Sequence, residues 1–175
     1  CSLVLTFKFS FMYRLIILII FICCSCNQTV KETIENTQYQ IDTKYNAGQF
    51  GTITEVIDVD KTVADKFIRY IYFDEKFNSV NDTLLIGTDK IWINNIELDF
   101  IAKKDFKVND KVIPVRKYNY YNIYSTSEIY LNDNGIIMVR IWGHNKPTIR
   151  KYDTKANSAI QKQILNDTAF FKLEY

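Results

Sequence analysis

Polar and apolar residues alternate in short runs through the second half of this chain, and the pattern predicts antiparallel strands. Between residues 96 and 101, Ile96, Leu98 and Phe100 share one face while two carboxylates share the other. Successive strand side chains point to opposite faces, so this run is expected to bury one face and expose the other. Turn-forming residues separate three such strands, at Thr83–Ile86, Lys90–Ile93 and Ile96–Ile101.

A hairpin between Glu128 and Trp142 is the clearest local signal. Two apolar runs, EIYL and IIMVRIW, flank the sequence NDNG. Asn134-Gly135 tolerates the positive φ that a tight hairpin turn requires. We therefore predict two paired strands here, with Thr148–Tyr152 adding a last strand to the same sheet.

The first part of the domain is less regular. Phe50–Val59 alternates as a strand does. Asp60–Phe73 fits either a capped helix or a strand, because helical spacing coexists with many β-branched and aromatic residues. The composition favours a strand over Lys66–Phe73.

Three further elements are expected toward the end of the chain. Lys111–Tyr118 is predicted to be a strand, and Pro114 inside it requires a sheet edge or a bulge because proline has no N–H. A short helix over Ser158–Leu165 is predicted, with Asn157 as its cap. Ala169–Tyr175 is expected to be a closing strand.

These elements predict a mainly β fold, an antiparallel sandwich or open barrel with one short C-terminal helix. Strands and helices do not alternate regularly, which argues against a doubly wound α/β sheet. Phe50–Tyr175 is expected to form a single domain around one core. Residues 27–49 are polar with few large apolar groups, so they are interpreted as a flexible tether before that domain.

The most apolar stretch lies near the beginning, from Met12 to Cys26. Arg14 precedes ten uninterrupted apolar residues, Leu15 to Cys24, and polar residues follow. A helix of that length spans about 15 Å, half of a hydrocarbon core of about 30 Å. The pattern therefore predicts an export signal rather than a permanent membrane span. Translation is expected to start at Met12, which makes residues 1–11 an extension of the reading frame.

The end of this stretch, Cys23-Cys24-Ser25-Cys26, resembles the lipobox of bacterial lipoproteins, in which small residues precede a cysteine that becomes the lipidated N-terminus. The resemblance implies a signal peptide over residues 12–25, lipidation at Cys26 and a tether over residues 26–49. It also implies a membrane-anchored lipoprotein of the bacterial cell envelope, facing the periplasm or the cell surface, with acyl chains such as palmitate as its anchor. Lipidation at Cys24, simple secretion and an uncleaved apolar helix are the alternatives.

Removal of the leader changes the charge balance. The chain has 22 Lys+Arg and 20 Asp+Glu; Lys8 and Arg14 lie within residues 1–26, which hold no acid, so 20 basic residues remain against 20 acidic ones. A formally neutral chain with interleaved signs has no electrostatic footprint for nucleic acid, and no nucleic-acid partner is expected. All four cysteines lie at or before Cys26, so the folded domain contains no disulfide.

The domain has few residues suited to catalysis or metal binding. It lacks cysteine and the G-x-S-x-G motif and has one histidine, His144, so we expect no catalytic nucleophile, no metal site and no cofactor. Asp58/Asp60 and Glu97/Asp99 are carboxylate pairs spaced i, i+2 on alternating strands, where exposure to solvent is the ordinary outcome. The alternative hypothesis is a small envelope hydrolase that uses such carboxylates together with tyrosine.

The remaining feature is a cluster of aromatic residues. An exposed stripe of rings could stack on sugar rings or form a protein interface, whereas the same rings could simply pack a small β core. We favour a non-enzymatic module that binds an envelope protein or a glycan. Its candidate binding surface consists of Tyr118, Tyr120, Tyr121, Tyr124, Tyr130 and Trp142.

Overall fold

The computed structural model describes residues 32–44, 51–73, 82–121, 125–142 and 147–171. Contacts divide the chain into Cys1–Lys31 and Glu32–Tyr175, and all described residues belong to the second unit. Its elements are β1 (Thr33–Lys44), β2 (Thr52–Ala64), β3 (Phe67–Phe73), β4 (Asp82–Gly87), β5 (Ile91–Ile93), β6 (Ile96–Glu97), β7 (Asp99–Val108), β8 (Lys111–Tyr121), β9 (Thr126–Asn132), β10 (Gly135–Ile141), β11 (Thr148–Lys151), α2 (Thr154–Asn166) and α3 (Thr168–Phe171).

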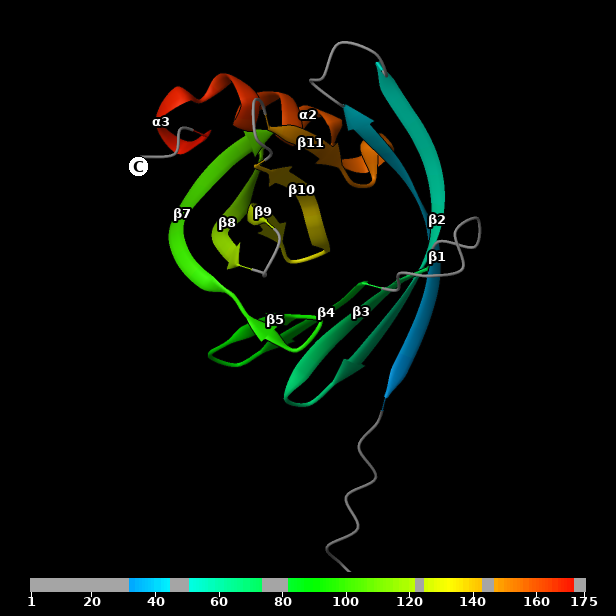
Figure 1. Ribbon diagram of the computed structural model, residues 1–175. Helices are drawn as coiled ribbons and strands as arrows, with labels where there is room; N and C mark the ends of the chain where they lie inside the picture. Colours follow the sequence, from blue (N-terminus) through cyan, green and yellow to red (C-terminus); the bar gives the residue numbers. More distant parts are fainter. Residues whose placement is uncertain (1–31, 45–50, 74–81, 122–124, 143–146, 172–175) are drawn as a thin grey trace, which may run out of the picture. The chain divides into compact units, whose positions relative to one another are not determined.

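The described strands form one 11-stranded antiparallel sheet in the order β6-β5-β4-β3-β2-β1-β11-β10-β9-β8-β7. Its two edge strands, β6 and β7, are consecutive in the sequence, and only Leu98 separates them. Because one residue joins the two edges, the sheet must curl, and it is nearly closed as a barrel (Figure 1). The predicted mainly β fold is confirmed in its open-barrel form, with a short helix near the C-terminus.

The inward face of the sheet holds the first of two apolar cores. Alternate side chains of β1–β5 and β8–β10 meet there, and Val59, Tyr70, Leu84 and Leu131 are completely buried. Strands that are distant in the sheet order therefore share one interior, which a flat sheet would not permit.

The second core lies on the opposite face of β7–β10, beneath α2 and α3. Two isoleucines of α2 and Phe170 of α3 pack there with Tyr130 and other side chains of the sheet. The buried Gln161 of α2 donates from Nε2 to the carbonyl oxygens of Ile137 (3.0 Å) and Tyr152 (2.8 Å). Ile137 lies at a β-bulge in β10, and its carbonyl also accepts the backbone N–H of Tyr152 at 2.9 Å, so the helix amide shares an acceptor with the sheet.

The interpretation of residues 26–49 as a tether is wrong for Thr33–Lys44, which form β1, and the domain begins before Phe50. β1 pairs with β2 along its whole length. Tyr39, Ile41 and Thr43 are partly or fully buried, whereas Thr33–Gln38 is exposed. Backbone hydrogen bonds rather than apolar burial hold the exposed part, and a hydropathy pattern does not record them. Residues 26–31 and 45–49 lie outside the described residues.

The strand predicted over Ile96–Ile101 is interrupted. Leu98 lies between β6 and β7 and is buried, whereas Ile96 and Phe100 are exposed. The expected shared apolar face is therefore wrong, because Leu98 marks the point where the chain passes from one sheet edge to the other. Its N–H donates to the carbonyl of Ile91 at 2.8 Å, which keeps it against β5.

Several local predictions are confirmed by the structure. Lys66–Phe73 is a strand apart from its first residue, and the 128–142 hairpin is present as β9 and β10. Pro114 lies in the part of β8 that pairs with β7 but not with β9, which is locally an edge.

Two predictions at the C-terminal end are wrong. α2 begins at Thr154, so Asn157 is a buried residue inside the helix rather than its cap. The closing strand expected from Ala169 is instead α3 up to Phe171, and residues 172–175 lie outside the described residues. Apolar burial favours the helix here, because Phe170 fills the second core.

Candidate functional site

The six aromatic residues predicted to form one surface do not lie together. Tyr130 is completely buried in the second core, and Tyr118 is buried in the first. Tyr120 packs against the first core, whereas Tyr121 is 52% exposed. Trp142 is half-buried, and Tyr124 lies outside the described residues.

Strand geometry explains this separation. Tyr118 and Tyr120 occupy inward positions of β8, while Tyr130 of β9 faces the opposite side of the sheet, beneath α3. Both faces of this part of the sheet are covered, one by the interior and the other by the helices. The stripe predicted from residues 118–142 is therefore mainly core, and the sequence gives no signal that both faces are covered.

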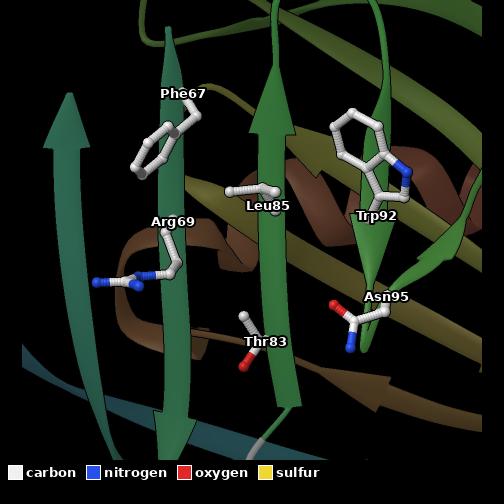
Figure 2. Close-up of a pocket in the computed structure, with 6 residues that line it drawn as sticks. All are labelled: Phe67, Arg69, Thr83, Leu85, Trp92 and Asn95. Atoms are coloured by element: carbon white, nitrogen blue, oxygen red, sulfur yellow. The ribbon is translucent and has the colours of Figure 1, made fainter. Parts of the chain in front are cut away.

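Two aromatic rings do flank an open pocket elsewhere, on the outward face of β3, β4 and β5. Figure 2 shows Phe67, Leu85 and Trp92 at one end of this pocket and three polar side chains, Arg69, Thr83 and Asn95, at the other. The pocket has a volume of about 540 Å³. Among the described residues, this pocket therefore presents apolar rings and hydrogen-bonding groups side by side, where a ligand can reach both.

Gly87 determines how Trp92 lies in this Phe67–Trp92 pocket. Gly87 pairs with Phe67 across the β3–β4 ladder, so its missing side chain would point outward between the two aromatic residues. A Cβ there would lie 3.0 Å from Cζ3 of Trp92 and 3.2 Å from the carbonyl of Lys90. The absence of a side chain lets the indole lie over the strand, which leaves an apolar floor beside Phe67.

Arg69 supplies the positive charge of the pocket. Its Nη2 donates to the Thr62 hydroxyl of β2 at 3.4 Å, and its guanidinium points toward β2 in Figure 2. The buried Nε of Arg69 has no hydrogen-bond partner among the described residues.

A buried ionic cluster lies beneath α3, away from the pocket. Glu128 is 0% exposed, and its Oε1 lies 2.6 Å from Nζ of Lys117, while its Oε2 lies 3.4 Å from Nη1 of Arg140. Tyr130 donates to Oε2 at 2.9 Å. Burial, followed by the charge of Glu128, raises the pKa of Tyr130, so the phenol remains a donor.

The two cations of this cluster also bind the last carbonyls of α3. Lys117 Nζ donates to the carbonyl of Phe170 at 3.0 Å, and Arg140 Nη1 donates to that of Phe171 at 2.5 Å. The Arg140 guanidinium lies between two rings, 4.1 Å from the centroid of Trp142 and 4.3 Å from that of Phe171. These contacts fasten α3 to the sheet, so the cluster has a structural role.

The carboxylate pairs of the alternative hydrolase hypothesis make surface contacts. Asp58 and Asp60 accept hydrogen bonds from Gln38 (3.0 Å) and Asn36 (2.9 Å) of β1. Glu97 pairs with Lys90 at 2.8 Å. Among the described residues, no group of three or more His, Cys, Asp or Glu side chains is placed to hold a metal ion. Cys26 and His144 lie outside them.

The sequence contained a weak signal for the Phe67–Trp92 pocket. FIRYIYF alternates two sets of side chains, and the outward set begins with Phe67 and Arg69. Trp92 lies 25 positions after Phe67 in the sequence, and only the ladder through β4 brings the two onto one face.

Neither protein-family models nor curated proteins match this chain. No helix formed by the described residues is both long enough and apolar enough to span a bilayer. The function of the domain is therefore inferred from its own side chains.

Proposed function

We propose that this protein is a lipid-anchored component of the bacterial cell envelope and that its β domain is a non-enzymatic module binding a glycan through the Phe67–Trp92 pocket. The anchor is Cys26, and the membrane is reached through its acyl chains. The observation that carries the binding role is the pairing of two accessible rings with the polar groups of Arg69, Thr83 and Asn95 on one sheet face.

The chemistry of the pocket suits a sugar better than a purely apolar ligand. One face of a pyranose ring presents C–H groups that pack on aromatic rings, while its hydroxyls need donors and acceptors nearby. The apolar end provides the packing surface, and the guanidinium, hydroxyl and amide at the other end provide the hydrogen bonds. An open pocket on a rigid sheet also admits part of a long polymer.

The intrinsic fluorescence of the protein allows a direct test of the pocket. The chain has two tryptophans, so Trp142→Phe leaves Trp92 as the reporter. Titration of this full-length variant with soluble peptidoglycan fragments should shift Trp92 emission to the blue in a saturable manner. Phe67→Ala should weaken this binding about tenfold, because one stacked ring is lost.

The matched control is Phe100→Ala, because Phe100 is an exposed ring on β7, outside the pocket. It should leave the titration unchanged. Dextran serves as a second, unrelated glycan. The glycan assignment would be overturned if neither peptidoglycan nor dextran shifted the Trp92 spectrum, or if the Phe67→Ala variant bound as tightly as the parent protein. If neither glycan shifted the Trp92 emission but a protein were recovered by crosslinking through the pocket, the pocket would instead be assigned to a protein partner.

The lipid anchor is tested separately. Labelled palmitate should enter the protein during growth, and the label should vanish in Cys26→Ala while it persists in Cys24→Ala. Several acyl chains hold a protein at a bilayer far more firmly than one, so the Cys26→Ala protein should also leave the membrane fraction. Label retained by the Cys26→Ala protein would refute this lipidation site.

A further inference from the structure

A second cavity lies on the inward face of the sheet, opposite to the face that carries the Phe67–Trp92 pocket. It has a volume of about 280 Å³. Apolar side chains of β9 and β10, including Ile129, Ile136 and Val139, line one part of it. Polar groups from β4, β8 and β11 line the rest, so the cavity is amphipathic.

Arg150 of β11 is the cationic side chain in this inner cavity. Its Nε donates to the Thr43 hydroxyl at 3.3 Å, and it shares a hydrogen bond with Tyr152. No carboxylate of the described residues lies within ion-pair distance of it. A partly buried guanidinium whose recorded partners are hydroxyls retains capacity for an anion, which it binds through two parallel N–H groups.

Two carboxylates, Asp82 and Glu55, act on Arg150 through their charge without forming an ion pair with it. Asp82 lines the cavity, and its Oδ1 accepts a hydrogen bond from the Asn94 amide at 2.9 Å. Burial opposes the charge of Arg150, yet Tyr152 and then the carboxylates of Asp82 and Glu55 outweigh burial and raise its pKa. The guanidinium is therefore charged at neutral pH.

We propose that this inner cavity binds a small carboxylic acid with an apolar body. The carboxylate lies on the Arg150 guanidinium, and the apolar body lies against Ile129, Ile136 and Val139. A volume of about 280 Å³ is small for a ligand pocket, so it suits a short-chain acid and not a phospholipid. Mouths of β-barrels are frequent sites for such ligands.

The test uses the full chain in phosphatidylcholine vesicles and three probes that share one alkyl chain: hexanoate, hexanol and hexylamine. Calorimetric titration, corrected with empty vesicles, should show hexanoate binding at least tenfold more tightly than hexanol. Arg150→Gln should bring the two within twofold of each other. Arg69→Gln is the matched control, because Arg69 faces the outer pocket, and it should leave the hexanoate preference unchanged.

A second variant protects the test against misfolding of Arg150→Gln. Val139→Phe fills the cavity without changing its charge and should abolish the binding of both hexanoate and hexanol. Tighter binding of hexylamine than of hexanoate would overturn the proposal, because it would show that the Asp82 carboxylate selects a cation. Absence of hexanoate binding, or a hexanoate preference that survives in a folded Arg150→Gln protein, would overturn it as well.

Discussion

The hydroxyl of Tyr72 on β3 accepts a hydrogen bond from the backbone N–H of Ile136 on β10 at 3.1 Å, across 64 residues of sequence. The same hydroxyl fills the space beside Gly135, where a Cβ would lie only 2.8 Å from it. Nearby, the hydroxyls of Tyr39 and Tyr70 donate to the carbonyls of the β9–β10 turn at 3.3 Å and 3.1 Å. Tyrosines of β1 and β3 thus hold this turn across the interior, which keeps the sheet curled.

Substitution of Gly135 by alanine should destabilise the fold by about 3 kcal/mol, because it adds strain at a positive φ to a steric overlap. Gly135 has a φ of +108°, and its added Cβ would collide with Tyr72. Gly51→Ala is the control, because Gly51 has a φ of +54° with nothing within 4 Å of an added Cβ. Its cost should be about 1 kcal/mol. Equal urea midpoints for the two variants would contradict the collision.

Removal of the Tyr72 hydroxyl should cost more than removal of the Tyr39 hydroxyl. Tyr72→Phe leaves the buried N–H of Ile136 without an acceptor, for an expected loss of about 1–3 kcal/mol in unfolding free energy. Tyr39→Phe frees a carbonyl at an exposed turn and should cost about 0.5 kcal/mol. Chemical denaturation of both variants measures the difference, and the reverse order would show that the Tyr72 bond does not matter.

Neutralisation of Glu128 should be strongly destabilising. Glu128→Gln leaves Lys117 and Arg140 beside each other without a compensating charge, and breaking a buried pair in this way costs about 3–5 kcal/mol. Glu97→Gln breaks a pair whose two side chains are 56% and 48% exposed, so its cost should be about 0–1 kcal/mol. Thermal unfolding compares the two, and a near-neutral Glu128→Gln would exclude the buried cluster as a determinant of stability.

Asp167 should make stability depend on pH at the acidic end. The hydrogen bond from Lys104, followed by that from the backbone N–H of Phe170, lowers the pKa of Asp167 below 3.8. The stabilisation is therefore complete above the ordinary carboxyl value and is lost as pH falls through the lowered one. The advantage of the native protein over Asp167→Asn should be constant near neutral pH and shrink below 3.8.

Lys104→Gln is the companion variant for this pH experiment, because it removes the largest cause of the Asp167 shift. It should lose the same acid-sensitive part of the stability. Unfolding free energies measured from pH 7 to pH 3 give both curves. An advantage over Asp167→Asn that grows as the pH falls would mean that the assigned sign is wrong.

Elements that carry their own turn chemistry could be predicted from the sequence. The hairpin of β9 and β10 follows from Asn134-Gly135 between two apolar runs, and Gly135 does have a positive φ. The strand over Phe67–Phe73 follows from its β-branched and aromatic composition. These signals are local, so the rest of the fold does not change them.

β1 could not be predicted from hydropathy, because its outer half is exposed and depends on backbone pairing with β2. The prediction of an exposed aromatic surface between residues 118 and 142 was wrong for a related reason. Their alternation was clear, but which face would be covered depended on α2 and α3, and on the curl of the sheet.

By itself the sequence determined the mainly β class and the local hairpins, because periodicity and turn residues act over a few neighbouring positions. The tertiary structure alone decided which aromatic residues face solvent. Pairing through β4 brings Phe67 and Trp92 onto one face of the sheet, and Arg150 reaches an interior built by strands from both halves of the chain. These arrangements depend on pairing between distant strands and on the curl of the sheet, and neither can be recognised from the local pattern of residues.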